Sequence, residues 1–172
     1  MMKILKSEFY KLKHTWIPWA HFILPVLYAL IFYGAATFTS LKNFSDMDII
    51  LNYFVLLGAI LPIIFGAITS KVVDMEASAG RFQVLLSTTK SRSKAYGGKL
   101  IMLLLSFLFS ISLAVFIFAM LFGNQATMAW LIELLLVFIG CLSTYMIHLC
   151  VSLMLGGGAS IGLGIAGSLI AA

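Results

Sequence analysis

The sequence predicts an all-α integral membrane protein, with an N-terminal amphipathic helix at the interface, at least four transmembrane helices and a partial fifth. The first observation behind this prediction is composition, because 62% of the 172 residues are hydrophobic and only 10% are charged. A protein whose surface faces water carries far more charge than this. The second observation is that apolar runs recur along the chain at the length of roughly 20 residues that crosses a hydrocarbon core about 30 Å thick.

The apolar runs organise the whole chain, residues 1–172, into one transmembrane domain. We expect an interfacial segment, four crossings and the start of a fifth, in that order, at residues 1–15, 16–38, 49–70, 100–122, 127–154 and 159–172. The last run reaches only about two-thirds of the length that a crossing needs. We therefore expect the fifth helix, and the chain, to continue beyond residue 172.

Basic residues predict how these helices are oriented. Lysines and arginines gather before the first crossing and in the long connection at residues 71–99, whereas the short connections at 39–48 and 123–126 carry no excess of them. By the positive-inside rule, the N-terminus and the long connection lie in the cytoplasm, and the short connections lie outside. The net charge of +5 thus belongs to segments beside the membrane, so we expect the lipid bilayer and no nucleic acid as its counterpart.

The N-terminal segment has the pattern of a helix that lies on a membrane surface. Leu5, Phe9, Leu12 and Trp16 recur at helical spacing. The remaining circumference is occupied largely by charged residues, which are Lys3, Lys6, Lys13 and Glu8. Such a helix can place its apolar stripe at the acyl boundary and its lysines among anionic headgroups. The pattern fits a simple topology anchor and a docking surface for a partner equally well.

The connection at residues 71–99 is the long polar segment of the chain. We expect a short amphipathic helix here, because two acidic residues open a segment that has an apolar edge at helical spacing. The acidic residues are Asp74 and Glu76, and the edge consists of Phe82, Leu85 and Leu86. This edge can pack on the protein's own helix ends, lie on lipid headgroups or enter a groove on a soluble partner.

In the order of its residues this loop resembles the loop of ABC-2 type permeases, which has a glutamate, a glycine, paired apolar residues, a Ser-Arg pair and a lysine. In this chain those positions are Glu76, Gly80, Leu85, Leu86, Ser91, Arg92 and Lys99. The order of an amphipathic N-terminal helix, two spans, the loop and further spans is similar as well, over essentially the whole chain. Members of that family typically have six spans.

The resemblance implies that the chain is the permease subunit of an ATP-driven transporter in a bacterial cell membrane. The loop would contact a cytoplasmic ABC ATPase dimer, and a second permease subunit, identical or different, would complete the transmembrane domain. The residues assigned to the ATPase contact are Glu76, Gly80, Arg81, Phe82, Leu85, Leu86, Ser91, Arg92 and Lys99. The chain is then not an enzyme and binds no cofactor or metal. ATP and Mg belong to the partner, in agreement with the lack of a G-x-x-x-x-G-K-[ST] phosphate loop in this sequence.

The glycine-rich stretch at residues 156–168 makes the chain most similar, within that family, to lantibiotic immunity permeases. The resemblance then implies export or expulsion of an amphipathic peptide antibiotic from the membrane, and so antibiotic resistance. The alternative function is a non-transporting membrane scaffold or sensor that recruits a cytoplasmic partner through its basic loop. A membrane-embedded enzyme is disfavoured, because the sequence lacks a convergent set of acid, base or metal-ligand residues.

A few further residues are candidates for the transport pathway or for helix packing. Glu133 is the acidic residue within a predicted crossing, and an ionisable group there is a functional candidate. Pro62 can kink the second crossing and shape a pathway, whereas we interpret His148 as structural. Small residues four apart on an apolar helix allow close helix contact. The residues with this spacing are Gly158, Gly162, Gly164 and Ser168.

Overall fold

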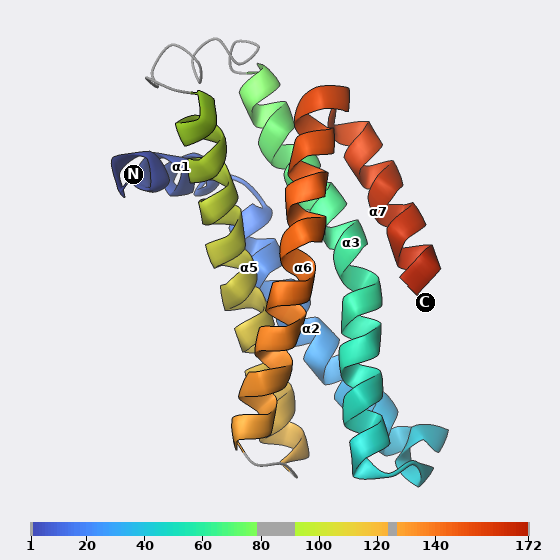
Figure 1. Cartoon of the computed structure of the whole chain (residues 1–172). Helices are drawn as coiled ribbons and strands as arrows, with labels where there is room; N and C mark the ends of the chain where they lie inside the picture. Colours follow the sequence, from blue (N-terminus) through green and yellow to red (C-terminus); the bar gives the residue numbers. More distant parts are fainter. Residues whose placement is uncertain (1, 79–91, 124–126, 172) are drawn as a thin grey trace.

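The computed structural model describes residues 2–78, 92–123 and 127–171, and this part of the chain is built from helices, with no strand in it (Figure 1). The elements are α1 (Met2–Leu12), α2 (Ile17–Phe38), the 3-10 turn η1 (Ser40–Asn43), α3 (Asp46–Ser78), α5 (Arg92–Phe122), α6 (Thr127–Leu155) and α7 (Gly157–Ala171). Four helices, α2, α3, α5 and α6, are long and apolar enough to cross a membrane, and α7 is a shorter apolar helix of 15 residues. The predicted all-α membrane fold is confirmed.

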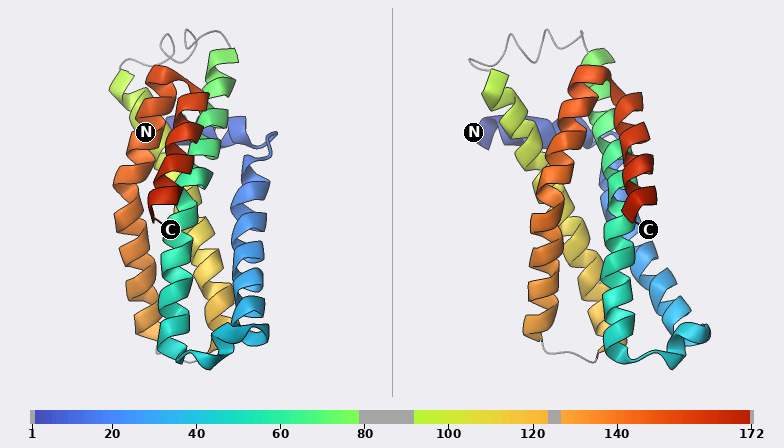
Figure 2. Two further views of the ribbon diagram at one scale, coloured as in Figure 1. Left: turned by 90° about the vertical axis from the view of Figure 1, so that its right-hand side faces the viewer. Right: turned by 45° about the vertical axis from the view of Figure 1, so that its right-hand side comes forward.

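The four long helices form a bundle, and α1 lies across one end of it (Figures 1 and 2). We call this end of the bundle the α1 end. Part of the predicted apolar stripe of α1 docks on the bundle, since Leu12 is buried and Leu5 is half-buried, whereas Phe9 and Trp16 are exposed. Glu8 lies between Leu5 and Leu12 on the same helical face and is buried as well.

Two membrane helices extend well beyond the crossings predicted from hydropathy. α3 continues to Ser78 and α5 begins at Arg92, so residues 71–78 and 92–99 are helical continuations of the membrane helices. Hydropathy marks where contact with lipid ends, whereas a helix continues until a breaker or a cap ends it, and residues 71–78 contain neither glycine nor proline. Asp74 and Glu76 therefore do not open a separate short helix, as the sequence predicted, but lie within α3. The predicted apolar edge around Leu85 lies outside the described residues.

An aromatic core holds the bundle together at the end far from α1. Tyr53 of α3 and Phe118 of α5 are both 0% exposed, and their rings stack with centroids 4.0 Å apart. The Tyr53 hydroxyl donates to the carbonyl of Ala114 at 2.9 Å, and the Tyr28 hydroxyl of α2 donates to the carbonyl of Tyr53. These bonds satisfy the polar ends of large rings inside an apolar bundle, so they hold α2, α3 and α5 in a fixed register.

The last helix, α7, packs against α3 along a face of small residues. The chain reverses at Gly156, whose φ of +91° suits glycine, and α7 then runs back beside α3 (Figure 2). A Cβ added to Gly66 of α3 would lie 2.6 Å from the carbonyl oxygen of Ser160. The buried residues of α7 are Gly157, Ser160, Gly164 and Ser168.

The four residues predicted for helix packing divide into two pairs. Gly164 and Ser168 are buried on the face toward α3. Gly158 and Gly162 lie on another face, where an added Cβ would meet no neighbouring atom within 4 Å. The spacing of four residues predicts that a small-residue contact exists, and the rotation of α7 about its axis decides which glycines make it.

The proline inside α3 also lies against α7. A Cβ added to Gly164 would lie 2.5 Å from the carbonyl oxygen of Pro62. The backbone N–H of Ile63, the residue that follows, donates to the Ser168 hydroxyl at 3.3 Å. A proline disturbs the regular backbone bonding around it, and here a side chain of α7 supplies a partner beside the disturbance.

The close contact between α3 and α7 predicts opposite outcomes for two glycines of the same helix. We expect Gly66→Ala to lower the free energy of unfolding by about 1–3 kcal/mol, because the added methyl group meets a backbone carbonyl that cannot move aside. In the matched control Gly58→Ala, the methyl group meets no neighbouring atom within 4 Å, and the higher helix propensity of alanine should leave stability unchanged or raise it by up to about 1 kcal/mol. Unfolding of the purified protein in detergent measures both values. Equal effects of the two substitutions would contradict the contact.

Candidate functional site

Four charged side chains meet at the α1 end of the bundle. The Lys99 Nζ lies 2.7 Å from Glu8 Oε2 and 3.0 Å from Glu76 Oε1. The Lys11 Nζ lies 2.8 Å from Glu8 Oε1 and 2.7 Å from Glu76 Oε1. Each lysine therefore bridges both glutamates, and the four ion pairs close into a ring. We call these four residues the charge ring.

Three helices bring the charge ring together. Glu8 and Lys11 are three residues apart on α1, a spacing at which side chains of a helix are neighbours. Glu76 lies near the end of α3, and Lys99 lies about two turns into α5. α1 packs on the bundle through Leu5 and Leu12, which lie on either side of Glu8 on one helical face. This packing places the Glu8 carboxylate in the interior. The charge ring thus forms only because α3 and α5 are longer than their apolar crossings.

Burial makes the charge ring strongly interdependent. Glu8, Glu76 and Lys99 are 4%, 7% and 2% exposed, while the side chain of Lys11 is 38% exposed. Charges withdrawn from water lose several kcal/mol of hydration each, and they are tolerated when opposite charges and hydrogen bonds compensate them. The ring contains two positive and two negative groups, so its formal charge is balanced. Removal of any buried member leaves the opposite charge without compensation.

Lys11, the most exposed member of the charge ring, is held in its charged form. Burial alone would lower the pKa of Lys11, but its hydrogen bonds and charge interactions with Glu76 and Glu8 outweigh burial. The pKa of Lys11 is therefore raised above its ordinary value. A protonated Lys11 keeps both bridges intact at neutral pH, so the charge ring persists across the physiological range.

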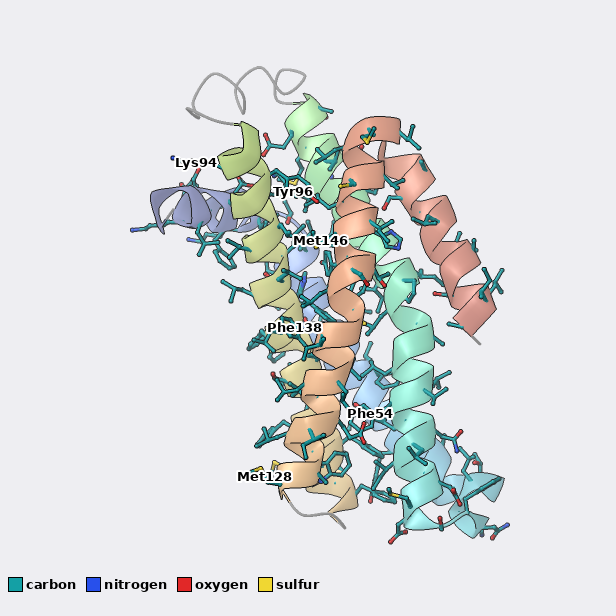
Figure 3. The ribbon with its side chains drawn as sticks, viewed as in Figure 1. Phe54, Lys94, Tyr96, Met128, Phe138 and Met146 are labelled. Carbon is teal, nitrogen blue, oxygen red and sulfur yellow. The ribbon has the colours of Figure 1, made fainter. Side chains whose placement is uncertain are left out.

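The start of α5 is also tied to α6 near the charge ring. Tyr96 of α5 lies beside Met146 of α6 (Figure 3), and its hydroxyl donates to the Met146 carbonyl at 3.5 Å. The same hydroxyl lies 3.2 Å from the sulfur of Cys150. A displacement of the first turns of α5 therefore acts on α1 through the charge ring and on α6 through Tyr96.

The structure describes three of the nine residues predicted for the ATPase contact. Glu76 and Lys99 lie in the charge ring, where their charged groups contact residues of this chain. Arg92 is the first residue of α5. The remaining candidates lie outside the described residues; they are Gly80, Arg81, Phe82, Leu85, Leu86 and Ser91.

Sequence reasoning missed two members of the charge ring, Glu8 and Lys11. A signal for Glu8 is present, because it recurs with Leu5 and Leu12 at the spacing of a single helical face. An acidic residue within an apolar stripe predicts a buried charge that needs a cationic partner. Which lysine supplies the partner depends on how close α5 comes to α1, and sequence spacing does not contain that information.

The two intramembrane candidates on α6 have different surroundings. His148 is 1% exposed, and its Nδ1 lies 3.0 Å from the Ser160 hydroxyl of α7. That hydroxyl also lies 2.9 Å from the Thr69 hydroxyl of α3, so the polar groups satisfy one another between three helices. Glu133 is half-buried and makes no hydrogen bond or ion pair with the part of the chain that the structure describes.

The burial of the charge ring predicts a large loss of stability when one cation is removed. We expect Lys99→Met to lower the free energy of unfolding by about 3–5 kcal/mol, because Glu8 and Glu76 remain buried with their charges only partly compensated. The matched control is Lys6→Met, which removes a lysine from the exposed face of α1 and should change stability by no more than about 0.5 kcal/mol. Chemical unfolding in detergent measures both, and a loss of less than about 1 kcal/mol for Lys99→Met would contradict a buried ring.

One comparison with known proteins identifies the family. A family model described as ABC-2 family transporter protein matches residues 4–165, which include most of α1, the helices from α2 to α6 and part of α7. Comparisons with curated proteins and with solved structures gave no match. The match covers nearly the whole chain and agrees with the four long apolar helices. The chain therefore belongs to the ABC-2 transporter family and is a multi-pass membrane permease component of an ABC transporter.

Proposed function

We propose that this permease subunit couples to a cytoplasmic ATPase dimer through residues 79–91, and that the charge ring carries the movement of this segment into the membrane helices. The observation that supports this proposal is the closed set of four ion pairs between α1, α3 and α5. α3 ends and α5 begins on either side of the segment. A force on this segment therefore acts first on α3 and α5, which are two of the three helices that the charge ring joins.

The helices have the lengths and contacts that such a transmission needs. α3 is continuous over 33 residues, or about 50 Å, so a tilt at its end near the ring displaces its other end. A packed interface responds to displacement by moving as a body between discrete arrangements. We infer that α1, α3 and the start of α5 move together, and that this movement switches the pathway between inward and outward access.

Charge supports the assignment of the α1 end to the cytoplasm. The lysines of α1, Lys71 near the end of α3 and the basic residues of the first turns of α5 lie at or next to this end. At the opposite end, α3 begins with Asp46 and Asp48, and Ser45 caps the helix through a hydrogen bond from the N–H of Asp48. An excess of basic residues marks the cytoplasmic side of a membrane protein.

We propose an amphipathic peptide antibiotic as the substrate, expelled from the lipid phase of a bacterial cell membrane in a complex of two permease subunits. Support comes from the resemblance of residues 156–168 to lantibiotic immunity permeases. Such a peptide enters a membrane with its apolar side, so a permease that meets it needs access from lipid. ATP and Mg would be bound by the ATPase partner.

The coupling proposal predicts that docking and transmission can be separated by substitution. We expect the double variant Leu85→Asp and Leu86→Asp to reduce co-purification of the ATPase by at least about tenfold, because apolar anchors typically carry the binding free energy of such contacts. Glu8→Gln should leave co-purification unchanged, since Glu8 belongs to α1 and not to the proposed docking segment at residues 79–91. It should, however, reduce the stimulation of ATP hydrolysis by the peptide, because it weakens the joint between α1 and α5.

One control variant and three outcomes decide this experiment. Lys6→Met should behave like the unaltered protein in both assays. Retained ATPase binding by the double aspartate variant would remove the docking assignment, whereas full stimulation in Glu8→Gln would remove the transmission by the charge ring. Failure to capture any ATPase with the unaltered protein would favour the scaffold or sensor function.

The substrate proposal predicts protection of living cells. Cells that express the permease with its ATPase should tolerate a higher concentration of a membrane-active lanthionine peptide than cells with the ATPase alone, and the aspartate variant should lose that protection. The measurement is the minimal inhibitory concentration. A soluble antibiotic with an intracellular target is the control, and equal protection against both compounds would contradict a peptide in the membrane as the substrate.

A further inference from the structure

We propose that a cavity between α2, α3 and α5 binds one acyl chain of a membrane phospholipid. The cavity has a volume of about 280 Å³ and is lined almost entirely by apolar side chains, with one residue of α6, Tyr145, closing its inner wall. This volume lies just below the range for small-molecule sites, about 300–1,000 Å³, which suits a single slender chain. The proposal does not depend on the ATPase partner or on the peptide substrate.

The length of the cavity matches the hydrocarbon part of one membrane leaflet. Its lining extends along α2 from Ala20 to Ile31, and along α3 from Leu57 to Ile68. Each stretch advances eleven residues, or about 16 Å of helix. Half of the hydrocarbon core of a bilayer is about 15 Å thick. The lining on α2 and the lining on α3 thus give the same length for the cavity. This length matches the depth to which one acyl chain extends into the bilayer.

The mouth of the cavity opens on the side of the bundle that faces lipid. Leu24, Leu27 and Ile31 line the cavity and are 40%, 47% and 69% exposed on α2, which is one of the helices that cross the membrane. In a bilayer, the molecules in contact with such a surface are the acyl chains of lipids. The nearest occupant of the cavity is therefore a lipid of the same leaflet.

Three polar residues of the cavity lining, His21, Ser110 and Tyr145, lie toward the α1 end, whereas the Tyr28 hydroxyl lies toward the other end and is already bonded to the carbonyl of Tyr53. The Nδ1 of His21 lies 2.9 Å from the carbonyl of Ile17, and the Ser110 hydroxyl donates to the carbonyl of His21 at 3.0 Å. Tyr145 is 0% exposed, and its ring centroid lies 4.2 Å from that of Phe65, close to the same end of the α3 lining. This distribution has the polarity of a lipid, with its ester groups toward the α1 end and its chain toward the bundle interior.

Tyr145 supplies a specific reason for a ligand. Its hydroxyl is buried and has no hydrogen-bond partner within the described ranges of the chain. Buried hydroxyl groups in proteins are almost always paired, and each exception calls for an explanation. An ester carbonyl is a hydrogen-bond acceptor without a donor of its own, so a phospholipid whose chain enters the cavity brings the kind of group that the tyrosine lacks.

The test uses the full-length protein in phosphatidylglycerol vesicles that contain a small fraction of the same lipid with a photoreactive diazirine on one acyl chain. After illumination, mass spectrometry maps the labelled residues. We expect labelling to concentrate on the cavity lining, including Tyr28, Ile60 and Ile64, over exposed positions of α6 such as Ile139. Uniform labelling of all lipid-facing surfaces would overturn the proposal.

Substitutions sharpen the test. Ile64→Trp fills the cavity and should abolish labelling of its lining, whereas Leu56→Trp, on an exposed part of the same helix, should not. Tyr145→Phe keeps the ring and removes the donor, so labelling of the lining should fall roughly two- to tenfold. An unchanged lining signal in both Ile64→Trp and Tyr145→Phe would overturn the proposal.

A final arm distinguishes the source of the chain. A free fatty acid that carries the same diazirine is offered in parallel with the phospholipid, to the unaltered protein and to Tyr145→Phe. Stronger labelling of the lining by the phospholipid supports the proposal, and labelling by the fatty acid alone contradicts it. Because Tyr145→Phe retains the packing of the ring against Phe65, its result stands even if the larger tryptophan at position 64 prevents folding.

Discussion

The balance of charge at the α1 end is the constraint on which the rest of the architecture depends. Two lysines and two glutamates meet there, and three of them, Glu8, Glu76 and Lys99, are buried. Each buried charge is tolerable only while the opposite charges are present. This requirement holds α1 across the bundle. It also accounts for the length of α3 and α5, because Glu76 and Lys99 reach the ring only from helices that continue past their apolar crossings. The opposite end is held together by aromatic stacking. Ion pairs therefore stabilise the packing at one end of the bundle, and apolar ring contacts stabilise it at the other.

The large features of the fold could be predicted from the sequence, because they follow from one-dimensional patterns. Four long apolar runs become four long helices, and the stripe around Leu12 becomes the docked face of α1. The end of α3 was predicted too early and the start of α5 too late. Hydropathy indicates which residues contact lipid, whereas a helix ends where a cap or a helix-breaking residue stops it. Residues 71–78 illustrate the difference, because they contain Lys71, Asp74 and Glu76 and are still helical.

The candidate site was harder to predict, because it depends on which helices approach one another. Glu76 and Lys99 were selected through a family resemblance as contacts to a partner, and in the structure their charged groups meet Glu8 and Lys11 of the same chain. The glycines of α7 show the same limitation on a smaller scale. Their spacing indicates a close contact, and the choice of Gly164 over Gly158 requires the rotation of the helix, which only the neighbouring helix fixes.

The fit of α7 against α3 has a consequence for how the protein is assembled in the membrane. Backbone meets backbone at Gly66 and Gly164, so the two helices interlock in a single axial register and cannot slide past each other. α3 precedes α7 in the chain and is therefore synthesised first, so α7 gains its place by docking against the small-residue face that α3 already presents. The order of α3 and α7 in the chain thus matches the order in which they can pack, because the helix that presents the contact surface is made before the helix that docks on it.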